Sequence, residues 1–329
     1  MAMKKQSSEI FYGKIILFGE YGIIFDSMAL TIPFTHFHGE LSFDNTYNRY
    51  KYTDYDFARN SNAQLESFTT YLRKITNEKK IDARFNFDRL VKDLDNGLYF
   101  ESSIPQGFGL GSSGALVAAL YSEYASNKIA GGRSVTKEET LELKETFSVM
   151  ESFFHGKSSG IDPLNSYIQF PLLIKSRSDI DTVGIPRNKI NGNSGIFLIN
   201  SGKPSKTGPL VNLFLEKCND AAYSDVISNQ YIPLNNSCIQ NLIDGEADSF
   251  FNNLSQLSEL QHDYFQPMIP SAFLPIWKEG LDTGIFNLKL CGSGGGGYLL
   301  GFTRDLFETQ DYFRKWDMEV VTVYKSSRG

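Results

Sequence analysis

Hydrophobic and polar residues follow two kinds of pattern along this chain, and together they predict a mixture of strands and helices. Apolar runs rich in β-branched and aromatic residues predict strands at 10–24, 29–33, 39–43, 98–104, 171–175 and 195–200, and a pair of strands within 286–302. Apolar residues at helical spacing, or runs of helix formers, predict helices at 62–76, 85–94, 115–124, 136–154, 209–222 and 239–264. Tyrosine, aspartate and asparagine fill residues 44–60, which we interpret as a hairpin or a surface excursion.

Two charged residues interrupt the first apolar run. Lys14 and Glu20 are the only charges within residues 10–24, so they are candidates for a functional site rather than for a solvated face. A purely structural alternative for Lys14 is the exposed start of an edge strand.

A glycine-rich loop separates the predicted strand 98–104 from the predicted helix 115–124. Its sequence, Pro-Gln-Gly-Phe-Gly-Leu-Gly-Ser-Ser-Gly at residues 105–114, has glycines at 107, 109 and 111. The first turn of a helix carries unpaired N–H groups and the positive end of the helix dipole. Glycines without a Cβ let a phosphate approach those groups, so a strand, this loop and a helix together predict an anion site.

Ser112 and Ser113 follow the loop glycines directly. At the cap and first turn of a helix, their hydroxyls could satisfy an unpaired N–H or ligate a magnesium ion that bridges phosphates. No lysine follows the last glycine, so the loop is not a Walker motif, and no acidic residue is placed for a dinucleotide. An ordinary glycine-rich loop with a serine cap remains the alternative.

Two carboxylates lie at the end of the next predicted helix. Thr136 and Glu139 form a capping-box pattern that predicts its start, and Glu151 falls in its last turn. Asp162 follows a glycine-bounded turn, which would fix the direction of its carboxylate. Because Pro163 comes next, Asp162 could instead be a helix N-cap with proline at the first helical position.

A second glycine-dense segment lies near the end of the chain. Five glycines occupy six positions at 292–297, between two apolar strands. Such a run costs backbone entropy, so we expect something to approach the backbone closely there, either a triphosphate or a closed active-site cleft. A separate loop at the end of strand 195–200 holds Lys203 and Lys206.

Composition excludes several classes of partner. The 329 residues are 41% hydrophobic with a net charge of −6, which argues against nucleic acid and anionic membranes. Three cysteines without paired spacing indicate reduced thiols and a cytoplasmic location, and the N-terminus does not resemble a signal peptide. No run approaches the roughly 18 apolar residues of a membrane span. His36 and His38 alternate, which would put them on one face of a strand, but four scattered histidines give no obvious zinc site.

Three separated motifs together resemble the signature motifs of the GHMP family of small-molecule kinases. They are Gly-Lys-Ile-Ile-Leu-Phe-Gly-Glu at 13–20, the loop at 105–114, and residues 289–297. The resemblance implies an α+β fold of two domains. It predicts a ribosomal S5-like N-terminal domain at 1–185 and a ferredoxin-like C-terminal domain at 186–329.

The same resemblance implies a role for each matching residue. Asp162 would be the catalytic base and Lys14 its cationic partner, while Ser113 and Glu151 would ligate Mg²⁺. ATP would bind to the backbone of the two glycine-rich segments, at Gly107, Gly109, Leu110, Gly111, Ser112, Ser113, Gly294, Gly295 and Gly296. We expect ATP and a small-molecule acceptor as partners, and leave a homodimer open.

Residues 155–162 look most like the corresponding stretch of the mevalonate kinase branch, so mevalonate is the implied acceptor. Glu20, Tyr21, His155 and Lys206 would then contact the acceptor. The chain departs from that branch's pattern at five positions, with Tyr21 for His, Gly114 for Ala, Ser158 for Pro, Ser205 for Arg and Ser293 for Ala. The form at residue 21 occurs in phosphomevalonate kinases, which are the main alternative. An ATP-binding homologue without activity is another.

Overall fold

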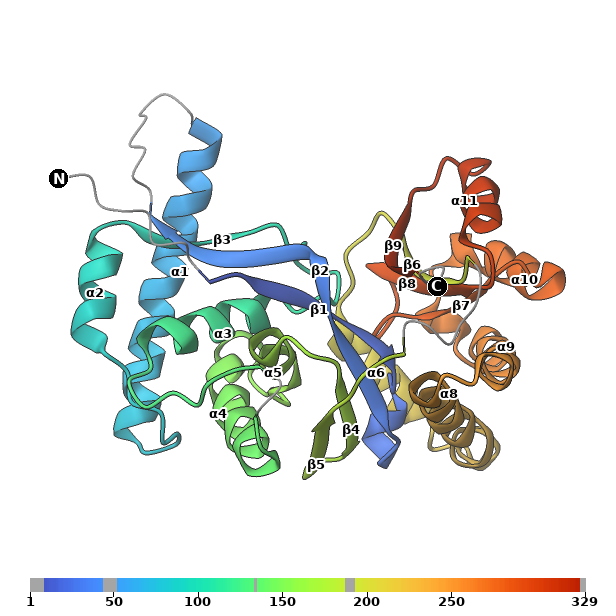
Figure 1. Ribbon diagram of the computed structural model, residues 1–329, viewed down its shortest axis with the longest axis horizontal. Helices are drawn as coiled ribbons and strands as arrows, with labels where there is room; N and C mark the ends of the chain where they lie inside the picture. The colour runs from blue at the N-terminus through green and yellow to red at the C-terminus, as the bar shows by residue number, and fades with distance from the viewer. Residues whose placement is uncertain (1–8, 44–51, 133–134, 187–192, 326–329) are drawn as a thin grey trace. The chain divides into compact units, whose positions relative to one another are not determined.

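The computed structural model describes residues 9–43, 52–132, 135–186 and 193–325 (Figure 1). Its helices and strands make up two compact units, each assembled from separate stretches of the chain. Unit 1 comprises Met1–Lys14, Pro33–Pro105 and Leu110–Phe170, and unit 2 comprises Ile15–Ile32, Gln106–Gly109 and Pro171–Gly329. The boundary between the units runs through the first two strands and the glycine-rich loop, so it differs from a single cut after residue 185. The family domains 1–185 and 186–329 remain a prediction.

Five strands form the first sheet, in the order β1-β2-β4-β5 with β3 also paired to β2. They are β1 (Phe11–Phe18), β2 (Ala29–Phe43), β3 (Leu98–Ser102), β4 (Leu172–Ser176) and β5 (Asp179–Thr182). Strand β2 joins the predicted runs 29–33 and 39–43 into one element. Its end pairs antiparallel with β3, from Gly39 opposite Ser102 to Phe43 opposite Leu98. Its start pairs with β4.

The first sheet is shared between the units, because β4, β5, residues 15–18 of β1 and residues 29–32 of β2 belong to unit 2. The described α-helices before Pro171 belong to unit 1. They are α1 (Tyr52–Asn77), α2 (Phe87–Asp95), α3 (Ser112–Tyr124), α4 (Lys137–His155) and α5 (Ile161–Ile168). Helix α3 packs mainly against α5 and also contacts α4, and the three lie together in Figure 1. Every residue from Gly114 to Ser122 is buried, which explains why this stretch of α3 is apolar on all sides.

The helix starting at Tyr52 corrects the interpretation of residues 44–60. The part from 52 to 60 is helical rather than a hairpin or an excursion, and residues 44–51 lie outside the described part of the chain. No glycine or proline stands between 52 and 77 to stop the helix. The predicted stripe of Leu65, Phe68, Leu72 and Ile75 is confirmed as buried, and Tyr, Asp and Asn upstream simply extend the same helix.

The start of α4 is confirmed as a capping box. Thr136 accepts a hydrogen bond from the Glu139 N–H, and the Glu139 carboxylate accepts one from the Thr136 N–H. The alternative role of Asp162 as an N-cap is wrong, because the N-cap of α5 is Gly160 and Asp162 is its second residue.

Unit 2 contains a second sheet of four strands in the order β7-β8-β6-β9. They are β6 (Gly195–Asn200), β7 (Asn287–Leu290), β8 (Tyr298–Thr303) and β9 (Val320–Lys325), and each neighbouring pair is antiparallel. Its α-helices are α6 (Thr207–Lys217), α7 (Ala221–Val226), α8 (Ile232–Asp244), α9 (Ala247–Tyr264), α10 (Leu274–Thr283) and α11 (Leu306–Arg314). Phe197, Phe286 and Phe313 form an aromatic core there, with ring centroids 4.9 to 6.4 Å apart.

The loops and short turns of unit 2 refine the remaining predictions. A 3-10 turn, η1 (Gly22–Phe25), ends the first apolar run, which the sequence pattern had continued as a strand to residue 24. The polar insert expected at 177–194 contains β5, and residues 187–192 lie outside the described ranges. No helix in the described chain is both long enough and apolar enough to cross a membrane.

Candidate active site

Lys14 and Asp162 form an ion pair in unit 1. Lys14 lies on β1 and Asp162 in the first turn of α5, and the distance from Lys14 Nζ to Asp162 Oδ1 is 3.1 Å. The Lys14 side chain is 5% exposed, so its alternative role as an exposed edge-strand residue is wrong. The Asp162 side chain is 32% exposed. A buried cation therefore holds a carboxylate that solvent, and hence another molecule, can reach.

The end of the glycine-rich loop lies against this ion pair. Gly111 is the N-cap of α3 with φ of 75°, a conformation that side chains disfavour. A Cβ on Gly111 would lie 3.0 Å from Lys14 Cγ and 3.4 Å from Asp162 Oδ2. The preceding Leu110 carbonyl accepts a hydrogen bond of 2.8 Å from the Lys14 N–H. Glycine at 111 thus lets the helix start directly beside the charged pair.

Ser112 and Ser113 are the first two residues of α3, and no side chain caps this helix. The expected serine cap is therefore absent at this position. Instead, Ser113 Oγ donates to Glu151 Oε1 at 2.9 Å and also lies 2.9 Å from His155 Nε2. Since the single hydroxyl proton is used on Glu151, His155 Nε2–H is the donor in the second contact.

Glu151 is 3% exposed and lies in the last turns of α4. Its Oε2 accepts a hydrogen bond from the Ser158 hydroxyl. Burial, followed by the nearby charge of Asp162, raises the pKa of Glu151 to about 7, although Ser158, Ser113 and Lys14 act in the opposite direction. The importance of Ser158 was missed from the sequence. The feature that could have revealed it is a hydroxyl-bearing residue at a position where the mevalonate kinase pattern has proline.

These oxygen donors fit a magnesium ion. Across the described ranges, no three His, Cys, Asp or Glu side chains come together as metal ligands. Ser113 and Glu151 nevertheless bring a hydroxyl and a carboxylate oxygen within 2.9 Å of each other. Magnesium in kinases commonly takes one or two protein oxygens and completes its shell with phosphates and water. The pair therefore suits a shared ion rather than an all-protein cage.

In unit 2, the start of the glycine-rich loop packs against the loop of Lys203. The Gly107 carbonyl accepts a hydrogen bond of 2.9 Å from the Ser205 N–H, and the Gly297 N–H donates to the Lys203 carbonyl at 2.6 Å. A Cβ on Gly107 would lie 3.1 Å from Pro204 Cβ, and one on Gly109 would lie 3.7 Å from the Cys291 carbonyl oxygen. Segments far apart in the sequence therefore meet here.

The protein's own backbone explains the glycine run at 294–297. A Cβ on Gly294 would lie 2.2 Å from the Met268 carbonyl oxygen, and one on Gly296 would lie 2.6 Å from that of Lys203. At Gly295 it would meet the Leu210 side chain at 2.6 Å. The close approach expected from the sequence is thus made by neighbouring loops. A role of Gly294, Gly295 and Gly296 in binding ATP remains a prediction.

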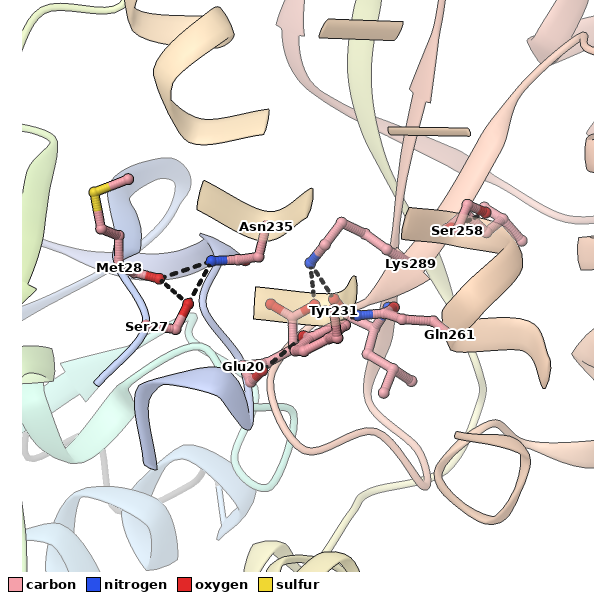
Figure 2. A network of polar contacts seen from close by, with 10 residues as sticks. Glu20, Ser27, Met28, Tyr231, Asn235, Ser258, Gln261 and Lys289 are labelled. Carbon is pink, nitrogen blue, oxygen red and sulfur yellow. Dashed lines mark hydrogen bonds and ion pairs between the residues drawn. The ribbon is translucent and has the colours of Figure 1, made fainter. Parts of the chain in front are cut away.

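Glu20 lies in a buried polar network of unit 2, shown in Figure 2. It forms an ion pair with Lys289, and its Oε1 also accepts a hydrogen bond of 2.8 Å from Gln261. Tyr231 donates to the Glu20 carbonyl at 2.7 Å, and Lys289 donates to the Leu290 carbonyl at 2.8 Å. The side chains of Glu20 and Lys289 are 2% and 0% exposed. Glu20 therefore contacts protein groups here, and its predicted contact with the acceptor is untested.

The other two predicted acceptor residues of unit 2 differ in exposure. Tyr21 is buried, with a φ of 60°, and its hydroxyl donates to the Ser293 carbonyl at 2.6 Å. Its ring lies 4.6 Å from that of Phe214, and burial raises the Tyr21 pKa well above its usual value. Lys206 is exposed at the N-cap position of α6.

The structure thus gathers the predicted residues into two groups, each within one unit. Unit 1 brings together the predicted catalytic and metal-binding side chains, the predicted acceptor residue His155 and the end of the glycine-rich loop. They are Lys14, Leu110, Gly111, Ser112, Ser113, Glu151, His155 and Asp162. Unit 2 contains the rest, namely Glu20, Tyr21, Gly107, Gly109, Lys206, Gly294, Gly295 and Gly296.

Comparisons with known proteins identify the class of protein to which this chain is similar. Residues 72–167 match the family model of the GHMP kinases N terminal domain. That range includes the whole glycine-rich loop, α3, α4 and Asp162. Residues 72–167 therefore resemble the N-terminal domain of the GHMP kinases, and the predicted resemblance to this family of small-molecule kinases is confirmed.

The relatives in this class include mevalonate kinases. The chain is 24% identical to the mevalonate kinase of Dictyostelium discoideum over 88% of its own length and 85% of that protein. Its fold is similar to that of L. major mevalonate kinase in complex with R-mevalonate, with a TM-score of 0.62, 17% identity and coverage of 98% and 97% of the two chains. Streptococcus pneumoniae phosphomevalonate kinase is similar to nearly the same degree, with a TM-score of 0.60, 15% identity and coverage of 97% and 98%. These solved structures confirm the predicted two-domain α+β fold.

Proposed function

We propose that this protein transfers the γ-phosphoryl group of ATP to the primary hydroxyl of mevalonate, giving 5-phosphomevalonate in isoprenoid precursor synthesis. The observation that carries the proposal is the Lys14–Asp162 ion pair beside Gly111. It puts a proton acceptor and a fixed cation at the start of a glycine-capped helix. Phosphoryl transfer depends mainly on positioning and on neutralising charge, and these groups supply both.

In the proposed reaction, the acceptor oxygen forms a bond to the γ-phosphorus while the bond from that phosphorus to the ADP oxygen breaks. The Asp162 carboxylate orients the acceptor hydroxyl and takes its proton. Lys14 keeps that carboxylate in place and stabilises negative charge developing on the acceptor oxygen. A positioned base of this kind contributes roughly 10²- to 10⁴-fold in rate.

Ser113 and Glu151 are the proposed protein ligands of Mg²⁺, which would neutralise charge on the phosphates when bound. The N-terminus of α3 and the backbone at Gly107, Gly109, Leu110, Gly111 and Ser112 would bind the ATP phosphates, with Gly294, Gly295 and Gly296 as further contacts. The bare N–H groups of the first turn and the helix dipole favour such an anion.

For the acceptor, His155 and Lys206 are the exposed candidates among the four predicted residues. His155 adjoins Ser113, so it is suited to contact the reacting end of the acceptor, and Lys206 is a candidate partner for the acceptor's carboxylate. Glu20 and Tyr21 are buried, so we propose that they shape the acceptor pocket. We also propose a cytoplasmic location.

A second acceptor, 5-phosphomevalonate, is favoured by one specific observation. Tyr21 occupies the position at which the mevalonate kinase pattern has histidine, and its hydroxyl is engaged by the Ser293 carbonyl. Phosphomevalonate kinase activity is therefore the alternative proposal.

The experiment is an assay of ADP release by the purified protein with Mg²⁺ and ATP, comparing mevalonate and 5-phosphomevalonate. Asp162→Asn should reduce kcat on the true acceptor by roughly 10²- to 10⁴-fold. Asp181→Asn is the matched control, because Asp181 also pairs with a lysine, at 3.0 Å, and its side chain is also 32% exposed. The control should retain normal activity.

Three outcomes separate the candidates. Turnover of mevalonate that collapses in Asp162→Asn supports the main proposal, and turnover of 5-phosphomevalonate alone supports the second. ATP binding without turnover of either acceptor would refute both and favour a catalytically silent homologue. Lys206→Ala tests the acceptor carboxylate separately, because an unchanged KM for the acceptor would exclude that contact.

A further inference from the structure

Ser158 makes three polar contacts at once. Its hydroxyl donates to Glu151 Oε2 and accepts a hydrogen bond of 3.0 Å from the Gly160 N–H. Its carbonyl accepts a hydrogen bond of 2.6 Å from the Ser148 hydroxyl, one helical turn before Glu151 on α4. One residue thus connects α4, the turn after it and the start of α5.

The turn between α4 and α5 is tightly held. Gly156 is the C-cap of α4 and Gly160 is the N-cap of α5. A Cβ on Gly160 would lie 2.2 Å from the Lys144 carbonyl oxygen and 2.7 Å from the Ser148 N. The turn therefore folds back onto the backbone of α4. Asp162 follows two residues after Gly160, so the contacts of Ser158 reach both the buried carboxylate and the helix start that carries the proposed base.

The two oxygens of Glu151 have different partners. Oε1 accepts from Ser113 and Oε2 accepts from Ser158. A carboxylate held at both oxygens cannot rotate about its terminal bond without losing a hydrogen bond. Ser158 therefore determines which way Oε1 faces, and Oε1 is the oxygen that meets the hydroxyl of Ser113.

We propose that Ser158 is a positioning residue, which fixes the Glu151 carboxylate so that Oε1 and the Ser113 hydroxyl are arranged to bind a divalent cation. The inference rests on the proposed function, in which Glu151 and Ser113 are the magnesium ligands. Hydrogen bonds from outside a metal's ligand shell commonly control affinity in this way. The mevalonate kinase pattern has proline at this position, and proline has no hydroxyl. The hydrogen bond from Ser158 to Glu151 is therefore a feature of this chain and not of that pattern.

The test is Ser158→Ala, with Ser152→Ala as the matched control. Ser152 is also half-buried, but its hydroxyl donates to the Ser148 carbonyl at 2.7 Å. Mn²⁺ is titrated into the nucleotide-free protein, and again with AMPPNP, while the EPR signal of free Mn²⁺ is followed. Ser158→Ala should weaken Mn²⁺ binding roughly 10- to 100-fold, and Ser152→Ala should leave it unchanged.

Two further readouts separate positioning from general loosening. In Ser158→Ala, the Mg²⁺ concentration for half-maximal activity should rise while the KM of the acceptor stays constant. In a double-mutant cycle of urea unfolding, Ser158→Ala and Glu151→Ala should be non-additive, because the two side chains are in contact.

Unchanged Mn²⁺ binding in Ser158→Ala, equal losses in both serine variants, or an additive cycle would each overturn the proposal. Failure of the proposed function has a different signature, since the wild-type protein would then turn over neither acceptor. The Mn²⁺ and unfolding measurements need no acceptor, so they support or overturn the role of Ser158 in either case.

Discussion

At the scale of single residues, Glu151 shows how burial sets the state of a side chain. Two hydroxyl donors and a nearby lysine favour its ionised form, yet burial and the charge of Asp162 outweigh them and raise the pKa from 4.5 to about 7. The folded protein therefore holds the Glu151 proton more tightly than the unfolded chain. The contribution of this group to stability is greatest below about pH 4.5, and it decreases as the pH rises to about 7.

Glu151→Gln should remove this decrease, because glutamine cannot ionise. Without divalent metal, the free energy of unfolding of the variant relative to wild type should increase between pH 5 and pH 8, by at most about 3 kcal/mol. Urea unfolding at both pH values with EDTA present measures it. A difference between variant and wild type that is the same at both pH values would show that Glu151 is not protonated near neutrality.

The sequence identified most residues of unit 1's site, but not their contacts. Lys14 stood out as a charge within an apolar strand, and Asp162 followed a glycine-bounded turn; the structure pairs them. Ser158 was noted as a departure from the pattern, yet its bond to Glu151 depends on how the turn folds back onto α4. Side chains that meet only through tertiary packing have no regular spacing in the sequence from which their contact could be predicted.

At the scale of elements, α3 and α5 approach so closely that a side chain is excluded between them. Gly114 is the third residue of α3, and a Cβ there would lie 2.7 Å from both the Asp162 carbonyl carbon and the Pro163 N. These are backbone atoms, so the crowding could be relieved only by moving α5. Gly114 therefore places the helix that carries Asp162 closer to the glycine-rich loop than alanine would allow.

Gly114→Ala should destabilise the protein although alanine is the better helix former. The gain in helix propensity is about 1 kcal/mol, and overpacking costs about 1 to 3 kcal/mol, at the upper end where the crowded atoms are backbone, so a net loss of up to about 2 kcal/mol is expected. A lower kcat should accompany this loss of stability, because α5 and with it Asp162 would move.

Gly208→Ala on α6 is the control. Nothing lies within 4 Å of a Cβ at Gly208, so this variant should be more stable than wild type by up to about 1 kcal/mol. Urea unfolding of both variants measures these changes in stability. An equal gain in stability for Gly114→Ala and Gly208→Ala would show that a Cβ at residue 114 is not crowded.

Element types were predicted well where the apolar pattern was strong, and boundaries less well. The stripe of α1 was recognised, but polar residues upstream concealed its first turns. The glycines at 294–297 were correctly read as a place of close approach, but the sequence could not tell a ligand from a neighbouring loop. To predict the start of α1 and the neighbour of the glycine run, one would have to know which parts of the chain pack against each of them.

At the scale of the whole chain, contacts between distant segments build unit 2. Its members include the end of β1, a short part of the glycine-rich loop and the chain after Pro171. A pattern read in order along the sequence predicts consecutive domains, so it could not reveal this interleaving. The Glu20–Lys289 pair is the clearest case, since it joins the first motif to the last within a fully buried environment (Figure 2).

This buried pair leads to a prediction for the stability of the chain. Lys289→Met would leave the Glu20 carboxylate buried without its cation, and Oε2 already lacks a partner within the described structure. Removing one partner of a buried ion pair costs about 3 to 5 kcal/mol, whereas replacing both charges can be nearly neutral. Lys289→Met should therefore lower the urea midpoint strongly, and Glu20→Gln with Lys289→Met should recover much of the loss.

Lys278→Met is the control, because Lys278 and Asp282 form an exposed pair, and its midpoint should not change. A double variant no more stable than Lys289→Met would mean that lost packing of the lysine stem, rather than the stranded charge of Glu20, determines the stability.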